Sequence, residues 1–200
     1  KLRLCFEKCR QYGISLNPEK CAFLVTSGII LGHVVSKVGK MPDPKKIEVI
    51  QEMPRPQHGA DVQVFNGFAQ FNRIYIKFYA HIMEPITKLM RKSEEFVWMD
   101  KCEAAWLEIK DRYTKAPILV APRWDLEFHV HTDASDIAVG AMLAQNQTGK
   151  CDQPISYASR LLNSAENNYT TTEKEALAMV YALTKYRHYL LGNKVVFYVD

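Results

Sequence analysis

The spacing of apolar residues changes at two prolines, Pro117 and Pro122, and this change limits the folds open to the chain. Between residues 60 and 115, apolar residues recur every three or four positions in three separate stretches, which is the period of amphipathic helices. From Leu126 to His131, apolar and polar residues alternate instead, as in a β-strand whose two faces differ. The sequence therefore predicts a helical region followed by a sheet.

The region after Pro122 predicts three strands, one long helix and a fourth strand, in that order. Further strands are expected at 138–144 and 155–159, the helix at 172–190 and the last strand at 195–199. If the last strand pairs beside the first in parallel, the helix forms a right-handed crossover between them. We predict an α/β (α+β) chain in which a β-hairpin and a helical region precede an incomplete mixed sheet with a crossover helix.

The first 56 residues predict a short helix, a hairpin and a second short helix. The first helix is ended by Gly13, and its apolar stripe consists of Leu2, Cys5, Phe6 and Cys9. Two β-rich runs, 22–25 and 29–35, flank Thr26-Ser27-Gly28, which has the composition of a hairpin turn. Asp43-Pro44 then supplies an N-cap followed by proline at the first helical position.

Composition excludes some classes of protein and leaves others open. With 48% hydrophobic and 24% charged residues, the chain is typical of a globular protein, and it has no apolar run long enough to span a membrane. The five cysteines include no Cys-x-x-Cys pair, which argues against a zinc or redox motif. The net charge of +4 is compatible with a polyanionic partner but does not require one. Because the chain starts at Lys1 and stops within an apolar run, we expect a fragment of an intracellular protein.

Three carboxylates occupy positions that folding alone does not explain well. Asp133 ends the first predicted strand, Glu175 lies in the first turn of the long helix, and Asp200 ends the strand after it. Parallel pairing of the two strands would bring all three to one sheet edge, where divalent cations such as Mg²⁺ or Mn²⁺ relieve their repulsion. Such a cluster suits two-metal phosphodiester cleavage. The residues alone also allow a turn role for Asp133, a capping box of Glu175 with Thr172, and a solvated Asp200.

Several segments of the second half occur in the order and spacing of ribonuclease H domains from Ty3/gypsy-type retrotransposon reverse transcriptases. They are Thr132-Asp133-Ala134-Ser135, Tyr157-Ala158-Ser159-Arg160, Asn168-Tyr169-Thr170-Thr171-Thr172-Glu173-Lys174-Glu175, Tyr186-Arg187-His188-Tyr189-Leu190-Leu191-Gly192 and Tyr198-Val199-Asp200. The chain resembles this family, and the resemblance implies that Asp133, Glu175 and Asp200 are catalytic and hold two Mg²⁺ or Mn²⁺ ions. Glu173 is the second choice for the ligand on the helix.

Other polar residues near the expected site receive weaker assignments. Arg160 is assigned to nucleic-acid binding because it follows the third strand next to that site, and Ser135 is assigned to the same role. His129 and His131 share one strand face at a spacing that a metal could use. Because no third ligand accompanies them, we interpret the two histidines as a structural pair.

The first half is similar to the end of the palm and to the thumb and connection of the same family. The similar segments are Leu16-Asn17-Pro18-Glu19-Lys20-Cys21, Leu31-Gly32-His33-Val34-Val35-Ser36, Pro42-Asp43-Pro44-Lys45-Lys46-Ile47 and Phe65-Asn66-Gly67-Phe68. The resemblance implies that Leu31, Gly32 and His33 form a hairpin that grips the primer, and that Arg73 contacts nucleic acid. The residues alone favour an ordinary hairpin in which glycine eases a tight contact. The implied segments are 1–56 (end of the palm), 57–120 (thumb and connection) and 121–200 (truncated ribonuclease H domain).

The resemblance implies an enzyme that copies RNA into DNA and hydrolyses the RNA strand of RNA–DNA hybrids. Polymerase carboxylates are expected upstream of Lys1 and a fourth nuclease carboxylate beyond Asp200, so we expect these residues alone to be inactive. The implied partners are the hybrid, the primer–template duplex and the other Pol polyprotein domains, in a cytoplasmic particle or the nucleus. A decayed or host-recruited nucleic-acid-binding module is the alternative. The segments before Asp133 argue against a third class, the integrase-type nucleases.

Overall fold

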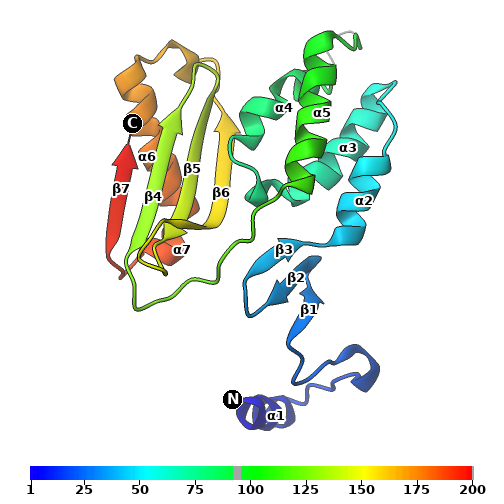
Figure 1. Cartoon of the computed structure of the whole chain (residues 1–200), viewed down its shortest axis with the longest axis vertical. Coiled ribbons are helices and arrows are strands. Elements are labelled where there is room, and N and C mark those ends of the chain that lie inside the picture. Colours follow the sequence, from blue (N-terminus) through cyan, green and yellow to red (C-terminus); the bar gives the residue numbers. More distant parts are fainter. Residues whose placement is uncertain (92–95, 200) are drawn as a thin grey trace.

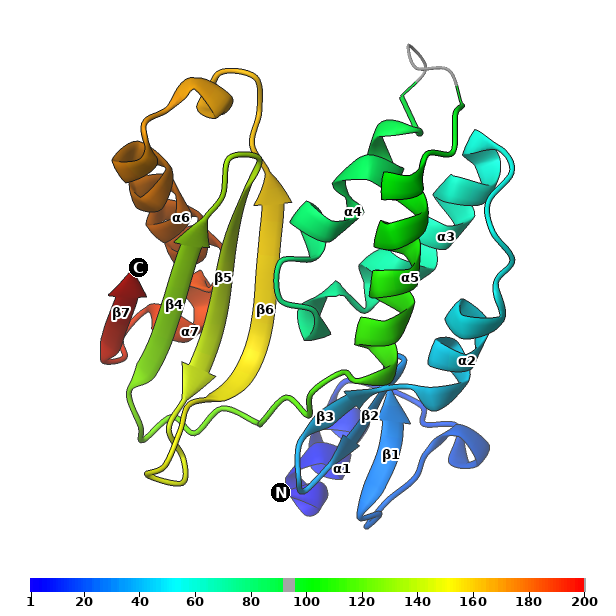
Figure 2. The same cartoon turned by 45° about the horizontal axis from the view of Figure 1, so that its top comes forward.

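The computed structural model describes residues 1–91 and 96–199, which form three units in chain order (Figure 1). The first is an N-terminal unit with a small sheet, and the second is a helical unit of residues 44–114. The third contains a larger sheet, called here the second sheet. The helical unit lies beside the second sheet, and the N-terminal unit lies below the helical unit (Figures 1 and 2). No helix in the described ranges is long and apolar enough to cross a bilayer.

The N-terminal unit contains a three-stranded antiparallel sheet rather than the expected two-stranded ribbon. Its elements are α1 (Leu2–Gln11), the 3₁₀ turn η1 (Pro18–Lys20), β1 (Ser27–Ile30), β2 (His33–Ser36) and β3 (Lys40–Pro42). The expected turn at Thr26-Ser27-Gly28 is wrong, because Ser27 and Gly28 lie within β1. The chain turns instead at Leu31 and Gly32, whose φ angles of +49° and +76° suit a tight hairpin.

The helical unit contains the three helices that the apolar periods predict, together with the predicted helix after Asp43. Its elements are α2 (Pro44–Glu52), α3 (Gly59–Phe71), the 3₁₀ turn η2 (Arg73–Tyr75), α4 (Tyr79–Lys88) and α5 (Asp100–Thr114). Asp43 caps α2 as predicted, since its carboxylate accepts a hydrogen bond from the Lys45 amide at 3.1 Å. Ile50 of α2 is buried in the same core as Phe65 and Trp106. Therefore α2 packs with the helical unit. The segments 1–56, 57–120 and 121–200 that the resemblance implies remain predictions.

The second sheet is mixed, as predicted, and has the strand order β6-β5-β4-β7. Its unit contains β4 (Phe128–Ala134), β5 (Ala138–Gln145), β6 (Gln153–Leu161), η3 (Glu166–Asn168), α6 (Thr171–Lys185), α7 (Arg187–Leu190) and β7 (Val195–Val199). Neighbouring strands are antiparallel except β4 and β7, which are parallel. The helix expected at 172–190 is divided at Tyr186, the residue between α6 and α7.

One face of the second sheet is covered by α6 and α7 (Figures 1 and 2). Phe128 and Val130 of β4 are fully buried on this face, in a core shared with Ala182 of α6 and Tyr186. Because side chains alternate along a strand, the intervening residues of β4 point to the opposite face. That face therefore carries Asp133, the first of the expected metal ligands.

Candidate active site

Asp133 lies near the carboxyl end of β4, on the face opposite α6, and is half-buried. Its neighbour across the sheet is Gly140 of β5. On the other side, Thr132 pairs with Val199, the last described residue of β7. Since β4 and β7 are parallel, their carboxyl ends meet at one edge of the sheet, as Figure 1 shows. Asp200, the third expected ligand, lies outside the described residues.

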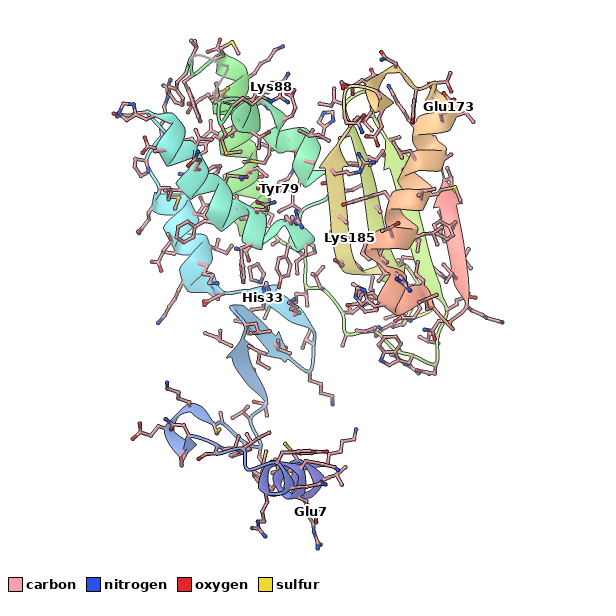
Figure 3. The ribbon with its side chains drawn as sticks, turned by 180° about the vertical axis from the view of Figure 1, so that it is seen from behind. Glu7, His33, Tyr79, Lys88, Glu173 and Lys185 are labelled. Carbon is pink, nitrogen blue, oxygen red and sulfur yellow. The ribbon has the colours of Figure 1, made fainter. Side chains whose placement is uncertain are left out.

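The start of α6 is fixed by a capping box between Thr170 and Glu173. The Thr170 hydroxyl accepts a hydrogen bond from the Glu173 amide at 3.3 Å, and the Glu173 carboxylate accepts one from the Thr170 amide at 2.8 Å. These hydrogen bonds lower the pKa of Glu173. The capping box gives Glu173, the second choice for the helical ligand, a structural role. The alternative box of Thr172 with Glu175, which the residues also allowed, is not formed. Figure 3 labels Glu173 at this end of α6.

Glu175 lies near the N-terminal end of α6, on the side of the helix that faces the sheet. Three residues further along, Ala178 is fully buried in a small core with Val139, and Ala134, the residue after Asp133, packs against this core. The Oε2 atom of Glu175 is itself buried. In Figure 1, α6 begins at the sheet edge where β4 and β7 end. The fold thus brings Asp133 and Glu175 to the same edge of the second sheet.

A cavity of about 200 Å³ opens beside Asp133. Its walls include Lys77 and Phe78 from the segment before α4, Gly140, and the side chains of His131 and Tyr198. Within residues 1–91 and 96–199, no three His, Cys, Asp or Glu side chains form a group that could hold a metal ion. The carboxylates of Asp133 and Glu175 are the hard oxygen donors that Mg²⁺ and Mn²⁺ prefer, so their chemistry fits the expected ions.

His129 and His131 share one face of β4, as predicted, and both contact the carboxylate of Asp152. The His129 Nδ1 lies 2.8 Å from Asp152 Oδ1, and the His131 Nε2 lies 2.7 Å from Oδ2. Burial would raise the pKa of Asp152, but hydrogen bonds from the two histidines outweigh it and lower the pKa. Tyr198 of β7 stacks on His131 with ring centroids 4.6 Å apart. These contacts tie β4 to β7 and to the chain before β6, which agrees with the structural interpretation of the pair.

Ser135 and Arg160 both have partners within the chain. The Ser135 hydroxyl accepts a hydrogen bond from the Ala138 amide at 3.1 Å and lies 3.1 Å from His81 Nδ1. Arg160 forms a two-pronged ion pair with Glu166, with N–O distances of 2.6 and 2.8 Å. The hydrogen bond from Arg160 lowers the pKa of the Glu166 carboxyl. The geometry gives both residues structural roles, and nucleic-acid binding by them remains a prediction.

The hairpin residues Leu31, Gly32 and His33 do not share one environment. Leu31 is 88% exposed at the tip, whereas His33 is buried between the three-stranded N-terminal sheet and the helical unit (Figure 3). The His33 Nδ1 lies 3.1 Å from the Tyr75 hydroxyl, and burial is the main cause that lowers the His33 pKa to about 4. Arg73 is half-buried in η2. Burial raises the pKa of Tyr79, and the charge of Arg73 partly opposes this rise. Contact of this hairpin and of Arg73 with nucleic acid remains a prediction.

A second hollow, which the sequence did not indicate, lies on the exposed face of α3. It has a volume of about 470 Å³ and is lined by Lys46, Gln63, Gly67, Phe68 and Phe71, among others. The Lys46 ammonium lies 3.7 Å from the centroid of the Phe71 ring. A side chain at Gly67 would meet nothing within 4 Å, so packing does not explain this helical glycine. The available signal was the spacing of Gln63, Gly67 and Phe71, which repeats every four residues.

Comparison with known proteins adds a family to this geometry. Residues 98–197 match the family described as the RNase H-like domain found in reverse transcriptase. The chain belongs to this family. The matched residues include β4, α6 and the start of β7, and therefore both described carboxylates of the candidate site.

Relatives of the whole chain are polyproteins of transposons. The chain is 38% identical over 94% of its length to the retrovirus-related Pol polyprotein from transposon 412 of Drosophila melanogaster. It is 33% identical over 90% of its length to the corresponding polyprotein from transposon gypsy of the same organism. The chain spans only 15% and 18% of these two relatives.

Solved structures agree on the fold. The foamy viral protease–reverse transcriptase dRH in complex with double-stranded DNA matches 98% of this chain and 35% of that chain, with a TM-score of 0.82 and 22% identity. The foamy viral protease–reverse transcriptase in complex with an RNA/DNA hybrid matches 90% of this chain and 24% of that chain, with a TM-score of 0.77 and 23% identity. The mixed α/β fold that was predicted from the sequence is therefore confirmed.

Proposed function

We propose that the chain is part of a reverse transcriptase whose RNase H-like domain hydrolyses the RNA strand of RNA–DNA hybrids. Asp133, Glu175 and Asp200 would hold two Mg²⁺ or Mn²⁺ ions at the edge of the second sheet. The observation that carries this proposal is the parallel pairing of β4 and β7, with α6 starting at the same edge. This topology brings Asp133 and Glu175, which lie far apart in the sequence, to one end of the domain.

Each described carboxylate has a separate task in this proposal. Asp133 is half-buried beside the cavity of about 200 Å³, so its oxygens can reach a group bound there. Glu175 presents a partly buried carboxylate from α6, a helix that the Thr170–Glu173 box holds in place. When bound, the ions would activate a water molecule and stabilise the leaving 3′ oxygen. The protein residues fix the positions of the oxygen donors.

The duplex partner is proposed from a continuous surface on the first two units. The hairpin tip contacts α3, because a Cβ at Gly32 would lie 2.9 Å from the Phe71 ring. The hollow on α3 presents a cation, an amide and aromatic rings from Lys46, Gln63, Phe68 and Phe71. Side chains of these types bind phosphates, groove edges and bases or sugars, largely without reading sequence. We propose that this surface contacts the primer–template duplex.

The experiment compares carboxylate variants in a longer chain that includes the whole nuclease domain. Cleavage of an RNA–DNA hybrid with Mg²⁺ is measured for the wild type, Asp133→Asn and Glu175→Gln. Glu173→Gln is the matched control, since glutamine also completes a capping box. Losing an outer partner of a metal ligand already costs about 10–100-fold, so losing a ligand should lower the rate by more than about 100-fold.

Two outcomes would contradict the proposal. Wild-type rates for Asp133→Asn or Glu175→Gln would remove the carboxylate assignment. Hybrid binding without cleavage by the wild type, in the presence of either metal, would favour the non-catalytic module instead. A Glu173→Gln variant that cleaves as the wild type does would show that the loss in Glu175→Gln does not come from a general effect on α6.

A further inference from the structure

The helical unit contacts the second sheet through the segment at the start of α4. The Ala80 amide donates a hydrogen bond to the Ser159 hydroxyl at 2.9 Å. Next to it, His81 Nδ1 lies 3.1 Å from the Ser135 hydroxyl. The ring of Phe78 covers Gly140 closely enough that an added Cβ would lie 2.6 Å from its Cε1 atom. Three residues of one short segment thus contact β5, β6 and the turn after β4.

Two of the contacted residues, Gly140 and Ser159, lie in one row across the sheet with Asp133. Asp133 pairs with Gly140, and Gly140 pairs with Ser159. Ser135 lies just after Asp133, in the turn between β4 and β5. The segment therefore rests on the sheet at the level of Asp133.

Phe78 and Gly140 each have a local conformational cost for the chain. Phe78 has a φ of +56°, in the left-handed region that residues other than glycine rarely adopt. Gly140 lies within β5, where glycine weakens a strand and lacks a side chain to pack. Such costs persist where the surrounding structure enforces them, and they concentrate at functional sites. The pairing of an aromatic ring with a glycine fixes the separation between the helical unit and β5.

We propose that Phe78 is a positioning residue for Asp133, acting through Gly140. The ring holds the β4–β5 pair at a fixed distance from the helical unit and forms one wall of the cavity that Asp133 lines. The Phe78–Gly140 contact, called here the joint, couples the unit proposed to contact the duplex to a carboxylate proposed to hold the catalytic ions. This inference rests on the proposed nuclease function.

The test uses the reverse transcriptase chain that contains the complete nuclease domain. Phe78→Ala removes the ring, Gly140→Ala pushes against it, and the double variant restores room for the added methyl group. We expect Phe78→Ala to lower kcat for hybrid cleavage about tenfold and to raise the Mg²⁺ concentration for half-maximal rate, with hybrid Kd within about twofold of wild type. Gly140→Ala should change both quantities in the same direction, and the double variant should be no worse than Phe78→Ala.

A control variant separates positioning from stability. Ala105→Gly lies in the core of the helical unit, away from the joint, and should lower Tm without changing the Mg²⁺ dependence. Unchanged kcat and Mg²⁺ dependence in Phe78→Ala would overturn the inference, as would effects equal to those of Ala105→Gly. The proposed function fails separately, if Asp133→Asn cleaves like the wild type. An inactive Asp133→Asn beside a fully active Phe78→Ala would overturn only the positioning role.

Discussion

Acidification should destabilise the fold through His33, which is buried and neutral in the folded chain. Its ring stacks on Phe71 with centroids 5.0 Å apart, and its Nδ1 lies 3.1 Å from the Tyr75 hydroxyl. Burial, and then the charges of Lys40 and Lys46, lower its pKa from 6.5 to about 4. In an unfolded chain the same imidazole binds a proton at the ordinary pKa.

The size of the effect follows from the difference between the two pKa values. Between pH 6.5 and about 4, the unfolded chain binds a proton at His33 that the folded chain does not bind, so the free energy of unfolding falls as the pH falls. The difference of about 2.5 corresponds, at about 1.4 kcal/mol per pH unit, to about 3 kcal/mol once the window has been crossed. Above pH 6.5, His33 is neutral in both states, so its titration no longer lowers the free energy of unfolding.

The assay compares the wild type with His33→Gln, which carries no titrating group but can still bond to the Tyr75 hydroxyl. Urea denaturation at about pH 7 and about pH 4 should show a loss of stability that is about 3 kcal/mol larger in the wild type. In an NMR titration of the six histidines, the signal missing from His33→Gln should have its midpoint near pH 4. A midpoint near 6.5, or equal losses in the two chains, would refute the reasoning.

Three further predictions concern two glycines and the cap of α6. Gly39→Ala should lower stability by about 1–3 kcal/mol, because Gly39 has a φ of +148° and an added Cβ would collide with the Leu119 carbonyl. Gly67→Ala should raise stability by about 1 kcal/mol, since its helical site is open, and should weaken duplex binding. Thermal denaturation measures the first effect and a binding titration measures the second. A stabilised variant with unchanged affinity would count against duplex binding by the α3 surface. Glu173→Ala should cost about 1 kcal/mol of stability, measured by thermal denaturation, whereas an unchanged Tm would mean that the capping box contributes little.

The sequence predicted the helices well because their signals are local. The Asp43-Pro44 start of α2 and the apolar periods of α3, α4 and α5 depend on residues within one or two turns of each other. The first hairpin was misplaced because its run at 22–25 is β-rich but does not pair, and Leu24 in it is 95% exposed. Strand pairing there is set by the turn at Leu31 and Gly32, where leucine adopts a positive-φ conformation that residue preferences do not predict. Only the family resemblance indicated a hairpin at these residues.

The candidate site was only partly accessible from the sequence. Asp133 and Glu175 follow from motifs and from strand order, and the capping box that accounts for Glu173 could be read from Thr170 and Glu173. The contact of Phe78 with Gly140 could not be predicted, because it joins elements about 60 residues apart and depends on how two units dock. Arg160 looked available for nucleic acid, yet its ion pair with Glu166 appears only once the turn after β6 has folded.

The parallel pairing of β4 with β7 also sets the order in which the second sheet can be completed during synthesis. The first three strands are neighbours in the chain and can pair as soon as they leave the ribosome, whereas β7 follows β4 by about 60 residues. At about 5–20 residues per second, one edge of β4 stays open for about 3–12 s in every new molecule. Unpaired edges recruit other strands, so a ribosome that stalls within α6 would leave neighbouring nascent chains free to associate.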